Sequence, residues 1–345
     1  MTTSEKKTAF EKNQKPSENV LLQFKGLEGF DVYNCSIPFT WKGRRYIYGR
    51  VEKRHEWARS WVRLFEETEK DTFVLSRNSM IYQLEDPFIA IIKGELVLGG
   101  TYVRYRRNQY YTFFTCFYRG TDLEDLRYFT SGPDFMKDIR LVELPQGIGV
   151  FSRPRNENVE KQYGSASVIG FTVIPDLDSL CPECIDSAAV IPGLFGKGEW
   201  GGCNQCYLLD SGYIGVIGHK SYHSPQNADP ASASTLSLDS TAFLHSSNPH
   251  NPMTPPSGLA VYINISFVFD PARNRILDEK ILAVRSSYPP GPAKKPELAD
   301  CTFTSGLVPR EDGKADLYGG LGDVAEGRIV IDYPFQGYGN ICKVF

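Results

Sequence analysis

One local pattern recurs five times along this 345-residue chain: an apolar segment, a turn with glycine, and a second apolar segment that ends in polar residues. The turn glycines are separated by 51, 53, 65 and 101 residues and are Gly43, Gly94, Gly147, Gly212 and Gly313. The first two intervals each match one four-stranded unit, and periods of this length are typical of β-propellers. The pattern predicts an all-β chain that folds as a single-domain, five-bladed β-propeller over residues 21–345.

Two segments lie outside this pattern. Residues 223–258 are rich in Ser, Asn and Pro, and they predict a long loop that lengthens the last interval. Residues 1–20 are polar and charged, which predicts a disordered tail. A β-sandwich is the alternative fold, but it gives no reason for similar polar residues after each hairpin. A propeller brings such residues together at one end of its axis.

Composition excludes several classes of protein. The formal net charge of −3 gives no overall attraction to nucleic acid or to an acidic membrane. Residues 102–111 interleave basic and aromatic side chains, as a single-strand nucleic-acid platform would, but a blade strand with one wet face explains them equally well. No apolar run approaches the ~18 residues of a membrane span, and the start of the chain lacks a secretory signal. We therefore expect a cytoplasmic protein without a nucleic-acid or membrane partner.

Eight cysteines include two Cys-x-x-Cys pairs, Cys181 with Cys184 and Cys203 with Cys206. This spacing matches structural zinc sites. However, the first pair lies in a helix-like stretch, residues 177–190, and the second leads directly into a strand. The chain is also large enough to fold without a metal. We expect free thiols in a reducing compartment, with no metal and no cofactor.

The segment Leu84-Glu85-Asp86-Pro87-Phe88 contains the leading candidate for a catalytic acid, Asp86. Pro87 favours an extended backbone at the preceding residue and cannot donate to a sheet, so it predicts a strand entrance at this point. A carboxylate there can face a central cavity. The alternative is that Asp86 only accepts hydrogen bonds at a turn, as most aspartates before proline do.

The other polar residues at equivalent points of the repeat combine cations with a few carboxylates. They are Arg50, Lys137, Asp138, Arg153, Arg155, His219 and Asp323. Each one alone fits a surface charge or a structural ion pair. Together with a carboxylic acid, a group of cations suits an anionic co-substrate such as phosphate, which arginine and lysine bind well.

The motifs resemble a known family. They are Gly49-Arg-Val-Glu52, Leu84-Glu-Asp-Pro-Phe88, Gly132-Pro-Asp-Phe-Met-Lys-Asp-Ile-Arg140, Phe151-Ser-Arg-Pro154, Trp200-Gly-Gly-Cys-Asn-Gln205 and Gly215-Val-Ile-Gly-His219. The chain is similar, from about residue 30 to residue 335, to the five-bladed mannosyltransferase-phosphorylases of trypanosomatid parasites. That family is allied to the inverting mannoside phosphorylases of glycoside hydrolase family 130, and its members make and degrade β-1,2-mannan.

The resemblance implies a role for each matched position. Asp86 would be the catalytic acid, and the phosphate-binding residues would be Arg50, Lys137, Arg153 and His219. The sugar-binding residues would be Glu85, Asp138, Asn204, Gln205 and Asp323. The sequence departs from the family pattern at Phe88, where the classical phosphorylases carry arginine, and at Gln205, where relatives often carry a carboxylate.

The resemblance also implies partners: a mannose oligosaccharide, inorganic phosphate or mannose 1-phosphate, and GDP-mannose as a second donor. An inverting glycosidase needs an acid and a base, whereas phosphate is already an anion and needs no base. A phosphorylase therefore needs one acid and a set of cations, as this sequence provides. The alternatives are a β-mannoside hydrolase and a non-catalytic propeller that binds carbohydrate or serves as a scaffold.

Overall fold

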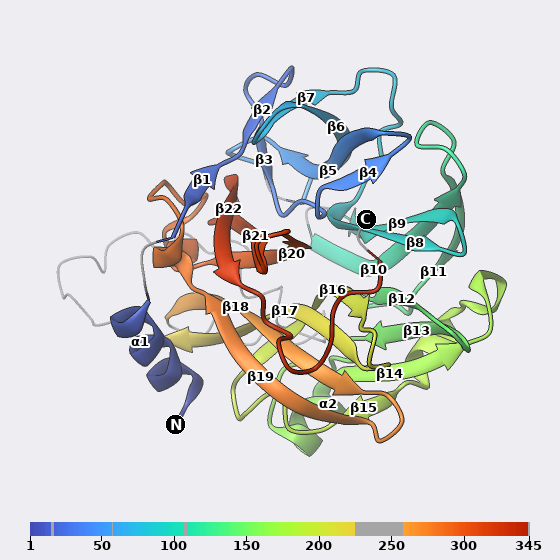
Figure 1. Cartoon of the computed structure of the whole chain (residues 1–345), viewed down its shortest axis with the longest axis vertical. Helices are drawn as coiled ribbons and strands as arrows, with labels where there is room; N and C mark the ends of the chain where they lie inside the picture. The colour runs from blue at the N-terminus through green and yellow to red at the C-terminus, as the bar shows by residue number, and fades with distance from the viewer. Residues whose placement is uncertain (15–16, 57, 107–108, 225–257, 344–345) are drawn as a thin grey trace.

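The computed structural model describes residues 1–14, 17–56, 58–106, 109–224 and 258–343. Within these residues the strands form five sheets, arranged around a common centre as the blades of a propeller (Figure 1). Neighbouring strands within the blades are antiparallel, except that β2 pairs with β7 in parallel. The predicted all-β, five-bladed propeller is therefore confirmed.

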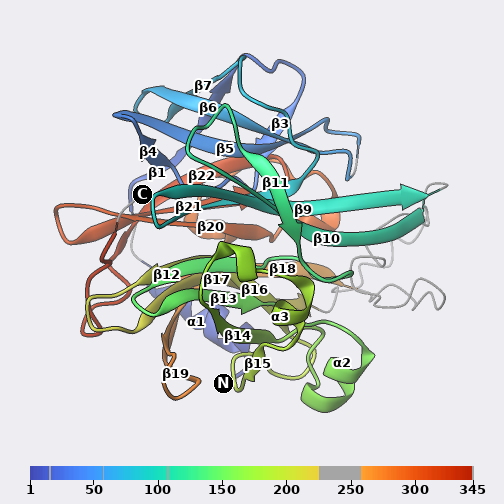
Figure 2. The same cartoon turned by 90° about the vertical axis from the view of Figure 1, so that its right-hand side faces the viewer.

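The first blade contains six strands, in the order β2-β7-β6-β5-β3 with β4 also paired to β5. Their bounds are β2 (Gln23–Lys25), β3 (Asp31–Tyr33), β4 (Phe39–Trp41), β5 (Arg44–Glu52), β6 (Trp61–Glu69) and β7 (Thr72–Leu75). The second blade contains β8 (Glu85–Ile92), β9 (Glu95–Arg106), β10 (Gln109–Gly120) and β11 (Arg127–Ser131). In Figure 2, β9 and β10 extend beyond the other strands at one end of the molecule.

The third and fourth blades follow in chain order. The third contains β12 (Arg140–Leu144), β13 (Gly147–Ser152), β14 (Ile169–Ile174) and β15 (Ala189–Ile191), with helix α2 (Glu157–Tyr163) after β13. The fourth contains β16 (Trp200–Leu208), β17 (Ile214–Ser224), β18 (Leu259–Asp270) and β19 (Arg275–Ala283). Most of the predicted long loop at 223–258 lies outside the described residues.

The fifth blade closes the ring. It contains β20 (Thr302–Pro309), β21 (Lys314–Leu321), β22 (Ala325–Asp332) and β1 (Asn19–Leu21), so the N-terminal segment supplies its outer strand. The 3₁₀ helices η4 (Arg285–Ser287) and η5 (Pro296–Leu298) lie in the connection from the fourth blade. Because strands from both ends of the chain share one sheet, unfolding of either end exposes the edge of the same blade.

The five hairpins predicted from the glycine turns are confirmed. Each predicted turn joins two antiparallel strands of one blade: β4 to β5, β8 to β9, β12 to β13, β16 to β17 and β20 to β21. Gly43, Gly94, Gly212 and Gly313 all have positive φ angles near +80°. Glycine adopts this conformation without the steric cost that other residues incur, which explains the recurring residue type.

The hydrophobic core lies between blades. Each of the five core clusters among the described residues joins two neighbouring blades. In the closing contact, Tyr318 of β21 packs with Phe65 of β6 and Val32 of β3, all at most 6% exposed. Burial of a side chain of this size stabilises the fold by ~1.5–3 kcal/mol. The fifth blade is thus held to the first by apolar contacts, and the chain runs from β1, which pairs with β22 in the fifth blade, into β2 of the first.

Two local predictions differ from the structure. Residues 1–20, predicted as a disordered tail, contain helix α1 (Thr3–Asn13), whose N-terminus has a capping box formed by Thr2 and Glu5. Lys7 of this helix forms an ion pair with Asp300 at 3.0 Å. Residues 177–190, predicted as helix-like, instead contain the 3₁₀ helix η1 (Leu177–Ser179), the short α3 (Pro182–Asp186) and the start of β15. Among the described residues, no helix has the length and apolar character needed to cross a membrane.

Candidate active site

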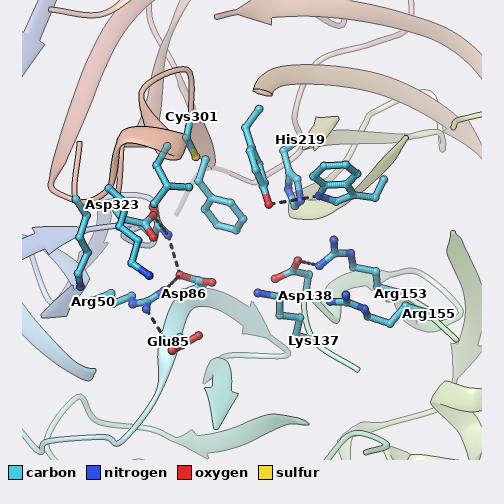
Figure 3. Close-up of a pocket in the computed structure, with 17 residues that line it drawn as sticks. Arg50, Glu85, Asp86, Lys137, Asp138, Arg153, Arg155, His219, Cys301 and Asp323 are labelled. Carbon is cyan, nitrogen blue, oxygen red and sulfur yellow. Dashed lines mark hydrogen bonds and ion pairs between the residues drawn. The ribbon is translucent and has the colours of Figure 1, made fainter. Parts of the chain in front are cut away.

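A pocket at one end of the propeller axis collects polar side chains from all five blades (Figure 3). Eight of the ten residues predicted to form the site line this pocket: Arg50, Glu85, Asp86, Lys137, Asp138, Arg153, His219 and Asp323. Arg155 also lines it, as expected. The sequence repeat therefore places these residues together because each one lies at the axial end of a blade.

Strained backbone brings several of these side chains to the axis. Asp86, Asp138, Asp323 and Asn34 have φ angles of +48°, +60°, +58° and +46°, in the left-handed region. Residues other than glycine rarely adopt this conformation, and such strain is concentrated at functional sites. The prediction of an extended backbone at Asp86 is wrong. A register shift between Glu85 and Phe88 allows the turned conformation despite Pro87.

One wall of the pocket is organised by Arg50. Its Nη1 lies 3.0 Å from Oδ1 of Asp86, and its Nη2 lies 3.2 Å from Oε1 of Glu85. The side-chain Nδ2 of Asn34 donates a hydrogen bond of 2.9 Å to the same oxygen of Asp86. The same nitrogen lies 3.5 Å from Oδ1 of Asp323. Burial, reinforced by the charge of Asp86, raises the pKa of Glu85 to about 7. Glu85 and Asp86 therefore share one guanidinium, and Glu85 retains its proton more readily than an exposed carboxyl group does.

The facing wall carries cations. Arg153 Nη1 lies 2.6 Å from Oδ2 of Asp138, and its Nε donates to the carbonyl oxygen of Gly201. Burial opposes ionisation of Asp138, but Arg153 and Lys137 hold its pKa well below its usual range. Figure 3 shows Lys137 extending towards the middle of the pocket. Among the described residues, none forms a hydrogen bond or an ion pair with its ammonium group, which leaves this cation available to a ligand.

His219 lies beside the cations and is fully buried. Burial and the charge of Arg153 lower the pKa of its imidazole to about 3, so the ring is neutral at physiological pH. Its Nδ1 lies 2.8 Å from Oδ1 of Asn204. With that oxygen as acceptor, Nδ1 carries the proton, and Nε2 can accept a hydrogen bond from a hydroxyl group. The rings of Tyr262 and Phe303 pack against the imidazole, with ring centroids 5.8 and 4.9 Å from its own.

Two predicted sugar-binding residues do not line the pocket. Asn204 is 2% exposed and holds His219, while its own carbonyl oxygen accepts a hydrogen bond from Arg140 at 2.6 Å. Gln205 is also 2% exposed and donates to the carbonyl oxygen of Ile89. A register shift between Cys203 and Gln205 accompanies this arrangement. Both residues therefore lie outside the lining of the pocket, and Asn204 contacts it only through His219.

Several residues of the pocket were not predicted as site residues from the sequence. They are Asn34, Trp200, Tyr262, Lys294, Lys295, Leu298, Cys301 and Phe303. Trp200 was noticed only as part of a motif, and the segment with Lys294 and Lys295 lies between blades, outside the repeat. Lys294 forms an ion pair with Glu52, which also contacts Arg50 at 3.5 Å. No positional rule from the repeat could have identified residues in such a connecting segment.

The two cysteine pairs lie away from the pocket. Cys203 and Cys206 belong to the apolar core between the third and fourth blades. Cys181 and Cys184 contact each other across the first turn of α3 through backbone N–H and sulfur groups. Among the residues that the structure describes, no three His, Cys, Asp or Glu side chains are grouped so that they could hold a metal ion. The absence of zinc stays a prediction.

The fold and the site define a five-bladed propeller whose axial pocket places carboxylic acids opposite cations. The chain belongs to the family described as "Protein of unknown function (DUF1861)", whose model matches residues 8–337. A comparison with curated proteins gives no match.

Solved structures place this family member among enzymes. MPT-4, a mannose phosphorylase from Leishmania mexicana solved with a phosphate ion, is 45% identical, with a TM-score of 0.85 over 99% of this chain and 96% of that one. MPT-1, a GDP-Man-dependent mannosyltransferase from the same organism, is 42% identical, with a TM-score of 0.84 over 99% and 98% of the two chains. These matches confirm the resemblance to glycosyl-transferring enzymes.

A more distant structure shares the fold alone. It is a β-1,2-mannobiose phosphorylase from Listeria innocua, 12% identical, with a TM-score of 0.55 over 89% of this chain and 91% of that one.

Proposed function

We propose that the protein transfers mannosyl units, with inversion, between a phosphorylated donor and β-1,2-linked mannose oligosaccharides. The observation that carries this proposal is the pairing, across one axial pocket, of the Glu85–Asp86 carboxyl pair with the cations Lys137 and Arg153. The relatives described as a mannose phosphorylase and a GDP-Man-dependent mannosyltransferase support the same sugar and both kinds of donor.

In phosphorolysis, Asp86 would protonate the glycosidic oxygen as the bond from that oxygen to the anomeric carbon breaks. A phosphate oxygen held by Lys137 and Arg153 attacks the anomeric carbon from the opposite face. The products are α-mannose 1-phosphate and an oligosaccharide shorter by one unit. In the synthetic direction Asp86 accepts the proton of the acceptor hydroxyl, and the cations stabilise the departing phosphate.

The neighbouring residues would have supporting roles. Arg50 and Asn34 both bind Oδ1 of Asp86, which fixes the orientation of that carboxyl group. Asp138 positions Arg153 through their 2.6 Å contact. Neutral His219 can accept a hydrogen bond from a protonated phosphate oxygen or a sugar hydroxyl, and Asp323, which lines the pocket, would contact mannose hydroxyls. Asn204 would act through His219, since it does not line the pocket.

GDP-mannose would present a diphosphate to the same cations. Arg155 and Lys295 also line the pocket, and they extend its positive charge beyond Lys137 and Arg153. A diphosphate carries more negative charge than a sugar 1-phosphate and would engage more of these groups. The proposal therefore includes mannose 1-phosphate and GDP-mannose as alternative donors.

A β-mannoside hydrolase is the second candidate function, because Asp138 and Asp323 also line the pocket. Hydrolysis needs a carboxylate that is free to activate water. Asp138 is held by Arg153, and burial raises the pKa of Asp323, with Asp86 adding to the effect. These contacts favour transfer over hydrolysis. A non-catalytic scaffold has no need for buried carboxylates opposite a lysine, Lys137, that has no ion-pair partner among the described residues.

The test is to incubate the protein with mannose and either mannose 1-phosphate or GDP-mannose, and to determine the linkage of the products. We expect β-1,2-linked oligosaccharides and their phosphate-dependent breakdown. Release of free mannose without phosphate would establish the hydrolase, and absence of any turnover would favour the scaffold. The Asp86→Asn protein is the matched control in every reaction.

A further inference from the structure

A second depression lies beside the axial pocket, at the junction of the first and second blades. We name it the blade 1–2 groove and define it by Arg59, Ser60, Trp61, Gln83, Tyr102 and Arg104. Trp61 begins β6, Gln83 precedes β8, and Tyr102 and Arg104 lie in β9 near its extended end (Figure 2). None of these residues has a role in the transfer mechanism described above.

The groove is connected to the pocket through hydrogen bonds. Ser60 accepts a hydrogen bond of 2.8 Å from Nε of Arg50, the guanidinium that also binds Glu85 and Asp86. The backbone N–H of Arg59 donates to Glu52 at 2.8 Å, and Glu52 in turn contacts Arg50. The groove and the acid-bearing wall of the pocket therefore adjoin each other at Ser60 and Arg50.

The side chains of the groove have the chemistry of a carbohydrate site. Trp61 is 37% exposed and has one edge contact, to Phe30, while Tyr102 is half-buried. Arg59, Arg104 and Gln83 are exposed and supply guanidinium and amide donors. Aromatic rings offer flat apolar surfaces to the C–H faces of sugars, and planar polar groups bind their hydroxyls. Within the groove, no carboxylate is present among the described lining residues to repel or bind a cation.

We propose that the blade 1–2 groove binds the distal mannose units of the acceptor oligosaccharide. This inference rests on the proposed function. Inversion requires the attacking phosphate and the leaving oxygen to lie on opposite faces of the anomeric carbon. The phosphate-binding cations Lys137 and Arg153 form one wall, so the leaving sugar chain extends towards the opposite wall, where Arg50 joins the pocket to the groove.

The test measures initial rates of transfer with mannose and with β-1,2-mannotetraose as acceptors. In wild-type protein we expect a lower KM for the tetraose than for mannose. In Trp61→Ala we expect this preference to fall about tenfold, because one stacking contact is lost, with kcat retained. Trp61→Phe keeps an aromatic ring and should restore most of the preference. Arg59→Ala, at an exposed side chain, gives a second variant should Trp61→Ala fail to fold.

Tyr128→Ala is the matched control. Tyr128 is 55% exposed on β11 and has an edge contact with Tyr118 at 5.8 Å, much as Trp61 has with Phe30 at 5.9 Å. This variant should keep the wild-type preference. If folded Trp61→Ala and Arg59→Ala both keep it as well, the groove inference is overturned. A change confined to the KM of GDP-mannose would also overturn it, because the groove would then bind a nucleotide.

The two proposals fail in different ways. Wild-type protein without any mannosyl transfer would overturn the proposed function and the groove inference with it. Wild-type protein that transfers mannose but uses the tetraose no better than mannose would overturn the groove inference alone.

Discussion

The Arg50 guanidinium binds Asp86 at 3.0 Å and thereby holds the strongest candidate for the catalytic acid in a fixed orientation. The same guanidinium binds Glu85 at 3.2 Å. A single positive charge thus serves two adjacent carboxyl groups that are both at most 6% exposed. Burial and the adjacent charge of Asp86 raise the pKa of Glu85, so Glu85 retains a proton that a solvated carboxyl group would lose.

Asp86→Asn should fold normally and lose both phosphorolysis and transfer, because one residue would serve as acid in one direction and base in the other. The expected loss is ~10²–10⁴-fold in rate. Thermal unfolding should confirm the fold, and product formation from mannose 1-phosphate should report the activity. Near-normal activity in Asp86→Asn would exclude this role, and Glu85, Asp138 and Asp323 would then be tested in that order.

The same pair predicts a dependence on pH. Because the pKa of Glu85 is raised to about 7, Glu85 gives up its proton as the pH rises through that value. The rate of phosphorolysis should therefore decrease above pH ~7, while activity below it is retained until other groups titrate. Glu85→Gln removes this titrating group and should shift the decrease. An unchanged profile in Glu85→Gln would show that the pair does not control the reaction.

Lys137 provides the cleaner test of the anion site. Its ammonium has no hydrogen-bond or ion-pair partner among the described residues, so Lys137→Met removes charge without orphaning another group. We expect the KM for phosphate to rise about tenfold or more, because charged hydrogen bonds contribute ~1.5–3 kcal/mol, with little change in Tm. Lys161→Met, at an exposed lysine of α2, is the control and should behave as wild type.

Arg153→Ala is a poorer test of the same anion site. Arg153 neutralises Asp138, which is 1% exposed, at 2.6 Å. Removing one partner of a buried ion pair typically costs ~3–5 kcal/mol. The variant should therefore lose stability as well as activity, which denaturant unfolding would reveal.

The repeat could be predicted from the sequence because each hairpin is specified locally, by β-forming segments and a glycine with positive φ. The polar residues of the axial pocket could be predicted for the same reason, because they occupy equivalent positions of the repeat. Contacts that depend on three-dimensional packing could not be predicted in this way. Asn34 and Lys294 lie in irregular connections, and the register shift at Cys203 turns Asn204 away from the pocket. The alternation of side chains along a strand fails at such a shift, so Asn204 and Gln205, predicted to bind the sugar, do not line the pocket.

Helix α1 shows a different limit. Its capping box, Thr2-Thr-Ser-Glu5, was legible in the sequence, but its residues are mostly polar and give little apolar periodicity. Its contacts with Asp300 and Ser286 come from the distant segment that precedes β20. A helix that depends on such tertiary contacts resembles a disordered tail when only the local sequence is considered.

Arg328 lies where the ring of blades closes, between the fifth blade and the first. Its guanidinium binds both oxygens of Asp71 at 2.7 Å, Asp316 at 2.8 Å and Glu18 at 2.6 Å, and so joins the fifth blade to the first and to the N-terminal segment. Arg328→Met should lower the free energy of unfolding towards the lower end of the ~3–5 kcal/mol range, because Asp71 and Glu18 are partly exposed. Arg127→Met, which breaks a fully exposed pair, should leave the unfolding transition unchanged. Equal effects of the two variants would contradict the proposed closure.

Asn204 and His219 give the last prediction. Burial and Arg153 lower the pKa of His219 to about 3, so the wild-type imidazole should show no titration by NMR between pH 5 and 8. Between pH ~6.5 and 3 the unfolded chain binds a proton at this position that the folded protein does not, so stability falls as pH falls through this range.

Asn204→Asp places a carboxylate 2.8 Å from Nδ1 of His219, which should raise the pKa of the imidazole and weaken the loss of stability at acid pH. An imidazolium beside Lys137 and Arg153 would also bind phosphate more tightly at pH 5 than at pH 8 in this variant. A wild-type His219 that titrates near pH 6.5 would refute the neutral-imidazole role and leave His219 as a third phosphate-binding cation.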